Sequence, residues 1–248
     1  MNEADFITAA TNGGGRVECR NGKLIVTGGY VSLPSLTSLP EGIVFRNGGY
    51  VYLPSLTSLP EGVEFRNGGY VSLPKLSSLP EGVEFRNEAY VYLSSLTKET
   101  QPYRGKTIRL RTVDGYTMLI ERERQVGDYL VSRARYFGGG DLDELEPCFV
   151  ASNGEYHAHG KTAGEAIRDV RFKVLQATTD VDELVSEIKD RDRITFEEFR
   201  LLTGACDEGL RHGLQQAGIN PDTEEMPLSD ALAAAHGPYG EQFKEMMA

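Results

Sequence analysis

The sequence predicts a β-solenoid of about four 20-residue coils, followed by an α+β domain in which an antiparallel sheet precedes helices. The first observation is a unit that repeats every 20 residues between residues 24 and 98, a period typical of solenoids. The second is a pair of hairpin signals, Asp114-Gly115 and Asn153-Gly154, between runs of strand-forming residues. The third is a series of helix-capping motifs after residue 160. The predicted parts are an N-terminal cap (1–23), the solenoid (24–101), an antiparallel β-meander (102–160) and an acidic helical part (161–248).

Each repeat contains a short stretch in which apolar and polar residues alternate, which indicates a strand. In Tyr50-Val51-Tyr52-Leu53 the two apolar side chains share one face, and the two tyrosines share the other. Stacked coils therefore place equivalent apolar residues in columns that form the core. These columns are Val31, Val51, Val71 and Val91; Leu33, Leu53, Leu73 and Leu93; Leu36, Leu56, Leu76 and Leu96; Leu39, Leu59 and Leu79; and Phe45, Phe65 and Phe85.

Two glycine-containing segments turn the chain within each predicted coil. We expect the Asn-Gly-Gly that follows each phenylalanine to form a positive-φ turn, and the Leu-Pro-Glu-Gly to form the next corner. The fourth copy is degraded and has Glu88-Ala89 in place of Gly-Gly. Before the first coil, residues 2–10 are predicted to form a short helix that protects the open end of the stack.

Tyrosines and arginines form the outward columns of the predicted solenoid. Both residue types are enriched in the hot spots of protein interfaces, so this face is a candidate protein-binding surface. The alternative interpretation is structural, because identical side chains stack in any solenoid. The candidate binding residues are Tyr30, Tyr50, Tyr52, Tyr70, Tyr90, Tyr92, Arg46, Arg66 and Arg86.

The segment Leu56-Thr57-Ser58-Leu59-Pro60-Glu61-Gly62 recurs every 20 residues. It resembles the short bacterial leucine-rich repeats that carry an L-T-S-L-P signature. The chain departs from that family because it lacks the L-x-x-L-x-L-x-x-N spacing. The resemblance therefore implies a leucine-rich-repeat-like β-solenoid rather than a standard horseshoe.

The meander is predicted to contain about five strands. Residues 106–113 and 116–120 flank Asp114-Gly115, residues 129–136 form a third strand, and residues 148–152 and 155–159 flank Asn153-Gly154. The glycine-rich and acidic stretch 137–146 is predicted to be a mobile loop.

The helical part shows several capping signals. Thr162 and Glu165 form one capping box, and Thr195 and Glu198 form another. Further helices are expected over residues 180–188, where Val181, Leu184, Val185 and Ile188 face inward; over 204–217; over 230–235, with Ser229 as cap; and from Glu241 onward.

The acidic charge lies almost entirely at the C-terminal end. The net charge is −11, and residues 179–248 contribute −10, with 6 Lys or Arg against 16 Asp or Glu. Nucleic-acid binding is therefore not expected, because a phosphate backbone requires clustered basic residues. The charge suits a basic protein partner, such as a nucleic-acid-binding host protein, while a simple solvated helical surface is the other interpretation.

Cysteine usage and hydropathy indicate the cellular compartment of the protein. Cys19, Cys148 and Cys206 are far apart and form no CxxC pair, which is typical of a reducing cytoplasm. No apolar run approaches the roughly 18 residues of a spanning helix, and the first residues lack the features of a signal peptide. We expect a cytoplasmic protein with no membrane association. A second copy of the chain, pairing through coil edges, is an alternative partner.

Two arrangements could support chemistry. Cys206 lies among small residues at a predicted helix start, where a thiolate is favoured, and with His159 it could form a Cys–His dyad of a transferase or hydrolase. The alternative is a small residue that permits close helix packing. His157 and His159 share a strand face, but without a CxxC or HExxH spacing no metal and no cofactor is predicted. A third hypothesis is a nucleotide-sequestering protein that uses Arg109, Arg111, Arg133 or Arg135.

Three motifs mark the C-terminal half: His159-Gly160-Lys161-Thr162, Thr203-Gly204-Ala205-Cys206 and Gly237-Pro238-Tyr239-Gly240. On these motifs, this half resembles the shared tail of uncharacterised proteins encoded by bacteriophages and prophages. The resemblance implies a mobile-element origin and no particular activity. With the Tyr/Arg columns and the acidic end, it suggests a non-enzymatic recognition or inhibitor protein, such as a phage-encoded antagonist of a host defence system that acts in the host cytoplasm.

Overall fold

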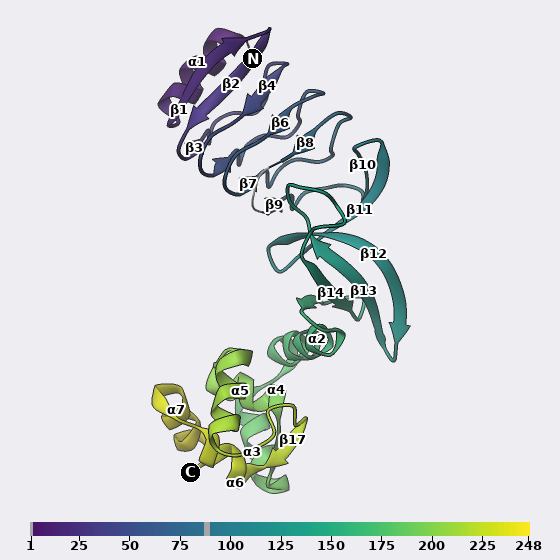
Figure 1. The fold of residues 1–248 in the computed structure, drawn as a ribbon. Coiled ribbons are helices and arrows are strands. Elements are labelled where there is room, and N and C mark those ends of the chain that lie inside the picture. Colours follow the sequence, from purple (N-terminus) through teal and green to yellow (C-terminus); the bar gives the residue numbers. More distant parts are fainter. Residues whose placement is uncertain (1, 87–89) are drawn as a thin grey trace. The chain divides into compact units, whose positions relative to one another are not determined.

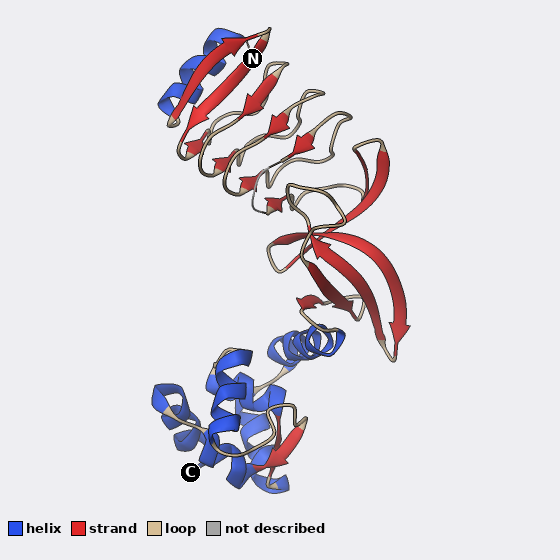
Figure 2. Ribbon diagram, viewed as in Figure 1, coloured by secondary structure: helices blue, strands red, loops and turns tan. Residues whose placement is uncertain are grey.

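The computed structural model describes residues 2–86 and 90–248, so the predicted Glu88-Ala89 turn lies outside the described residues. The chain divides into two compact units, Met1–Ala166 and Ile167–Ala248, which we describe separately. The first contains a β-solenoid of about three turns and an antiparallel sheet (Figure 1). The second consists mainly of helices (Figure 2).

The solenoid is built from two parallel sheets with strand orders β2-β4-β6-β8 and β3-β5-β7-β9. Its strands are only two or three residues long after β2, because each coil turns at the Asn-Gly-Gly and at the Leu-Pro-Glu-Gly. The strand bounds are β2 Lys23–Gly28, β3 Val31–Ser32, β4 Ile43–Phe45, β5 Val51–Tyr52, β6 Glu64–Phe65, β7 Val71–Ser72, β8 Glu84–Phe85 and β9 Val91–Tyr92.

The predicted interior columns are confirmed. Equivalent residues pair in register between neighbouring coils, as Val51 does with Val71. The valine column is fully buried, and the leucine columns are buried except for Leu96, which is half-buried. Phe45, Phe65 and Phe85 stack with ring centroids 5.1 Å apart at each step. Close-packed identical rings thus hold the coils at a fixed spacing.

The structure corrects the prediction that the Asn-Gly-Gly turn has positive φ. Glycine φ is positive at the other corner, at Gly42, Gly62 and Gly82, whereas Gly68 and Gly69 do not adopt positive φ. A Cβ on Gly68 would lie 2.8 Å from the Gly48 carbonyl oxygen of the preceding coil. Glycine is therefore needed here because the coil backbones approach closely, and not because of the turn conformation.

An asparagine ladder, which the sequence analysis did not single out, lies inside this turn. Asn47 and Asn67 are buried at 2% and 1% exposure. The Asn67 Nδ2 donates to the carbonyl oxygens of Gly49, Gly69 and Tyr70 at 3.1, 2.5 and 3.4 Å. Each side chain thus joins its own coil to the preceding one by donating to backbone carbonyls of the turn.

The N-terminal cap contains a helix and a strand. Helix α1 (Glu3–Asn12) buries Phe6 and Ala10 against the first coil, and the Ser32 N–H donates to the Gly13 carbonyl. Strand β1 (Gly15–Arg20), which the sequence analysis did not predict, pairs antiparallel with β2 and extends the first sheet.

A six-stranded antiparallel sheet with order β10-β11-β12-β13-β14-β15 follows the solenoid. At the predicted hairpin, Asp114 and Gly115 both have positive φ, 52° and 81°, as a two-residue turn requires. At the second hairpin, β15 begins only at His157, and the Asn153 Oδ1 accepts from the N–H groups of Glu155 and Tyr156. The strand bounds are β10 Thr100–Tyr103, β11 Lys106–Val113, β12 Tyr116–Val126, β13 Tyr129–Tyr136, β14 Pro147–Ser152 and β15 His157–Gly160.

The stretch 137–146, predicted to be a mobile loop, instead closes the last coil of the solenoid. In earlier coils the valine N–H donates to the tyrosine carbonyl of the next coil, as Val71 does to Tyr90. The Val91 N–H instead donates to the Phe137 carbonyl at 3.0 Å. Phe137 is fully buried, and its ring packs edge-on against Phe85 with centroids 5.8 Å apart. The solenoid and the sheet therefore share one hydrophobic core.

Both predicted capping boxes are confirmed, Thr162 with Glu165 at the end of the first unit and Thr195 with Glu198 in the second, and several helix bounds change. Thr195 accepts from Glu198 N–H, and the Glu198 carboxylate accepts from Thr195 N–H. Ser229 is not a cap, because its helix begins at Leu228, and Val181, expected to face inward, is 44% exposed. A two-stranded pairing of β16 with β17 was not predicted. The elements from α2, which spans the boundary, to the C-terminus are α2 Ala163–Thr178, α3 Val181–Arg191, β16 Arg193–Thr195, α4 Phe196–Thr203, α5 Asp207–Gln216, β17 Glu225–Pro227, α6 Leu228–Ala234 and α7 Gly237–Met247.

Among the described residues, no helix has the length and apolar character that a membrane span requires.

Candidate functional site

The predicted tyrosine column is an exposed ladder on the solenoid. Tyr30, Tyr50 and Tyr70 are 53%, 49% and 39% exposed, although each is a large aromatic residue. The rings of Tyr50 and Tyr70 are parallel, with centroids 5.3 Å apart, and Tyr70 lies 5.7 Å from Tyr90. Their position is fixed by the buried valine that follows each tyrosine, because neighbouring strand residues point to opposite faces. We call Tyr30, Tyr50, Tyr70 and Tyr90 the tyrosine ladder.

The neighbouring outward residues are less uniform. Tyr52 is exposed and Tyr92 is half-buried. Arg66 pairs with Glu64 of the same strand, and the Arg86 Nε lies 2.6 Å from the Glu84 carboxylate. Of the three predicted arginines, two are thus engaged with acidic neighbours.

Arg46 differs from the other two because the first coil has Val44 where the later coils have glutamate. Its side chain is exposed, and no ion pair to it is found within the described residues. The arginine column is therefore less cationic than its sequence indicates, and the ladder is the more distinctive feature of this face.

The tyrosine ladder continues into an aromatic cluster on the sheet. Tyr90 lies 5.6 Å from Tyr116 and 5.3 Å from Tyr136, measured between ring centroids. His159 contacts both of these tyrosines, with centroid distances of 5.3 and 5.7 Å. The His159 Nδ1 is 2.6 Å from the Asp114 carboxylate. His159, predicted as one member of a dyad, thus packs beside the ladder and is held by the β11–β12 turn.

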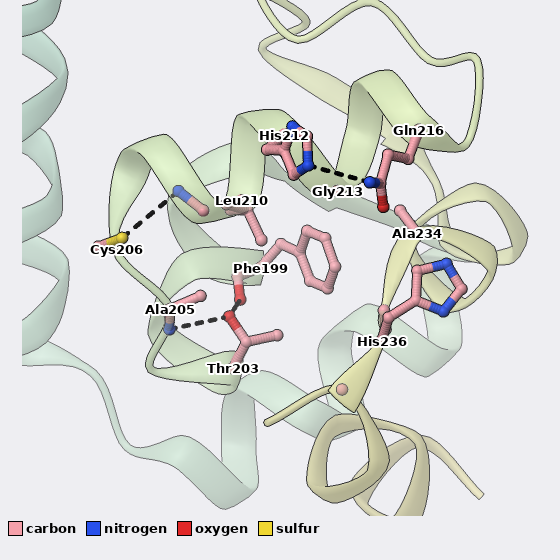
Figure 3. A pocket seen from close by; sticks show the side chains of 13 residues that line it. Phe199, Thr203, Ala205, Cys206, Leu210, His212, Gly213, Gln216, Ala234 and His236 are labelled. Atoms are coloured by element: carbon pink, nitrogen blue, oxygen red, sulfur yellow. Dashed lines mark hydrogen bonds between the residues drawn. The ribbon is translucent and has the colours of Figure 1, made fainter. Parts of the chain in front are cut away.

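Cys206 occupies a different environment, in the second unit. It is the N-cap of α5, where its Sγ accepts from the Gly209 N–H at 3.4 Å, and the residue is exposed. It borders a pocket of about 370 Å³ together with His212 and His236, from α5 and the α6–α7 junction (Figure 3). The floor is apolar and includes Phe199.

The predicted Cys206/His159 dyad combines residues of two different units. Within the described residues, Cys206 has no hydrogen bond to a histidine, and the His212 Nε2 pairs instead with the Gln216 side-chain amide at 2.9 Å. Neither His212 nor His236 was predicted as a site residue from the sequence. Their only local signal is the four-residue spacing from His212 to Gln216 on one helix face.

The other hypotheses receive less support from the geometry. In the described part of the chain, no three His, Cys, Asp or Glu side chains are grouped as a metal site requires. Cys148 is buried beside Met118, and burial raises the pKa of its thiol to about 12. The four arginines proposed for nucleotide binding form ion pairs with carboxylates of Glu99, Glu121 or Glu123; they are Arg109, Arg111, Arg133 and Arg135.

No protein-family model matches the chain, and no curated protein and no solved structure shows a significant match to it.

Proposed function

We propose that this chain is a non-enzymatic recognition protein that binds a protein partner through the tyrosine ladder. The observation that carries the proposal is the exposure of stacked tyrosines along a solenoid whose interior columns are buried. A tyrosine has few rotatable bonds and a polar tip, so a preordered ladder offers contact area at a small entropic cost. Both ends of the solenoid are covered, by α1 and by the 137–146 segment, so the ladder face is left available for binding.

The finer parts of the proposal rest on the sequence. We propose that the solenoid is a leucine-rich-repeat-like fold of about four coils, because the Leu-Thr-Ser-Leu-Pro-Glu-Gly signature recurs with its period. The resemblance of the C-terminal half to phage and prophage proteins favours an antagonist of a bacterial defence system that acts in the host cytoplasm. The net charge of −10 in residues 179–248 favours a basic partner.

A double substitution in the middle of the ladder tests this function. We expect Tyr50→Ala/Tyr70→Ala to reduce capture of the partner from bacterial lysate by about 30-fold or more, because a hot-spot tyrosine contributes about 2 kcal/mol or more. Arg66 is left unchanged, because it is already paired with Glu64. Capture is measured by pull-down with quantitative mass spectrometry, and folding by circular dichroism.

The matched control is Thr57→Ala/Lys75→Ala, which alters exposed residues of the Leu-Pro-Glu-Gly side of the coils. It should capture as much partner as the unmodified chain. If the folded tyrosine variant captures an undiminished amount, the ladder is not the binding surface.

A second candidate function is a Cys206-dependent transferase or hydrolase, favoured by the pocket that Cys206 borders. If this function holds, iodoacetamide at neutral pH should alkylate Cys206 about tenfold faster than Cys19, because a catalytic nucleophile must be more reactive than an ordinary exposed cysteine. Both cysteines are exposed, so Cys19 serves as an internal control, and peptide mass spectrometry measures both rates. Equal rates would remove the support for an activated nucleophile.

A further inference from the structure

A pocket of about 330 Å³ lies where the tyrosine ladder meets the sheet. The rings of Tyr90 and Tyr136 form one part of its wall, and their centroids are 5.3 Å apart with planes inclined at 45°. Gly138, Gly139 and Leu145 line the rest, together with the carboxylate-bearing residues Glu144 and Glu146. Gly138 is held in place by its bridge to Tyr90, so the wall belongs to the cap of the solenoid.

No basic side chain among the described residues neutralises the carboxylates of this pocket. Glu146 accepts a hydrogen bond from the Tyr90 hydroxyl at 2.9 Å. Across residues 2–86 and 90–248, neither Glu144 nor Glu146 forms an ion pair with a lysine or arginine. Their negative charges are therefore available to a cationic ligand.

The arginines near the pocket already have other acceptors. Arg135 pairs with Glu121 and donates to the Leu145 carbonyl. Arg104 donates to the Gly140 carbonyl and lies 3.6 Å from the Asp141 carboxylate. Within the described residues, both arginines are thus engaged elsewhere, and neither forms an ion pair with Glu144 or Glu146.

The aromatic walls add to this negative character. The hydrogen bond to Glu146 raises the pKa of Tyr90 to about 12, and burial, followed by the nearby Cys148 and Glu146, raises the pKa of Tyr136. Both rings are therefore neutral phenols at physiological pH, and their π faces attract cations. Aromatic faces beside carboxylates are the arrangement that binds an ammonium or guanidinium group.

We propose that this pocket binds a cationic side chain, the ammonium of a lysine or the guanidinium of an arginine, on the partner that the tyrosine ladder recognises. The proposal rests on the proposed function for the identity of the ligand as part of a protein partner. The Tyr70–Tyr90 contact makes the pocket continuous with the ladder, so a partner segment lying along the ladder reaches it with its next side chain. The ladder then supplies contact area, and the pocket selects for a basic residue.

Small probes test the pocket without the partner. N-acetyl-arginine N-methylamide and N-acetyl-lysine N-methylamide are titrated into the ¹⁵N-labelled full chain, and the amide shifts of Gly138 and Gly139 are followed. N-acetyl-citrulline N-methylamide is the control, because it replaces the guanidinium with a neutral urea of the same shape. We expect at least one cationic probe to bind about tenfold or more tightly than citrulline, in line with combined cation–π and ion-pair contributions. The comparison of the two cations identifies which side chain is preferred.

Variants locate the binding site. Glu144→Gln/Glu146→Gln keeps an oxygen that can accept from Tyr90 and should weaken the cationic probe about fivefold, because the ion-pair contribution is lost and the cation–π contribution remains. Glu155→Gln, on the exposed β14–β15 turn, is the matched control and should bind like the unmodified chain. Equal binding of cationic and neutral probes, or unchanged binding in the double glutamine variant, would overturn the proposal.

The outcomes separate this inference from the proposed function. Tyr50→Ala/Tyr70→Ala should still bind the cationic probe, because the pocket contains neither residue. Loss of partner capture in that variant, together with no cation-selective binding in the unmodified chain, would sink the pocket and leave the ladder function standing. If the unmodified chain binds cationic probes selectively but the tyrosine variant captures an undiminished amount of partner, the ladder function is contradicted instead.

Discussion

Replacing Phe137 with alanine is expected to lower the free energy of unfolding of the first unit by about 3–5 kcal/mol, the range for truncating a buried phenylalanine. The ring is fully buried and packs against Phe85 and Tyr103, with centroid distances of 5.8 and 5.3 Å. Its removal leaves a cavity at the point where the solenoid core and the sheet core join. Urea denaturation followed by circular dichroism measures the loss.

The same variant should expose the last coil. Because the Phe137 carbonyl accepts from the Val91 N–H, we expect faster hydrogen exchange at Val91 than at Val51 in the variant. Asp143→Ala, an exposed change in the same segment, is the control and should alter stability by no more than about 0.5 kcal/mol. A loss below about 1 kcal/mol for Phe137→Ala would show that the 137–146 segment does not hold the solenoid closed.

Asn67→Asp is expected to be similarly damaging, about 3–5 kcal/mol at neutral pH, although it changes only one group of atoms. The Asn67 Nδ2 donates to three backbone carbonyls, and the side chain is 1% exposed. A carboxylate at this position removes the donors and places a buried negative charge against carbonyl oxygens. The loss of stability is measured by urea denaturation at pH 7.

Asn153→Asp provides an isosteric control. The Asn153 Oδ1 acts as an acceptor for two backbone N–H groups on an exposed turn, and an aspartate can accept both. This variant should unfold within about 0.5 kcal/mol of the unmodified chain. If Asn67→Asp were equally harmless, the asparagine ladder would not be needed to hold the coils together.

The two halves of each coil were not equally predictable from the sequence. The strand half was predictable from Val51 and Leu53, because alternation fixes which side chains share a face and the period fixes which ones stack. The Leu-Pro-Glu-Gly corner was also predicted, but the positive φ expected for the Asn-Gly-Gly turn was wrong. Whether Gly68 serves a positive-φ turn or a close backbone approach depends on the distance to Gly48 in the preceding coil, which no local pattern records.

The candidate site was likewise only partly predictable from the sequence. The tyrosine ladder follows from the repeat, and the structure shows that Tyr30, Tyr50 and Tyr70 are exposed. The surroundings of His159 and Cys206 could not be predicted. His159 contacts Tyr116 and Tyr136 because antiparallel strands bring distant segments together, and Cys206 shares its pocket with His236 because α6 packs beside α5.

The sequence by itself determined the 20-residue period, the buried columns, the Asp114-Gly115 hairpin and the capping boxes, because each depends on residues that are close in the chain or repeat at a fixed interval. Only the tertiary structure decided which segment closes the solenoid and which residues of the sheet the tyrosine ladder contacts. Phe137 completes the last coil and Glu146 meets Tyr90 across 56 residues of sequence separation. Such pairings are selected by packing of the whole unit, so they carry no signature in the segments that form them.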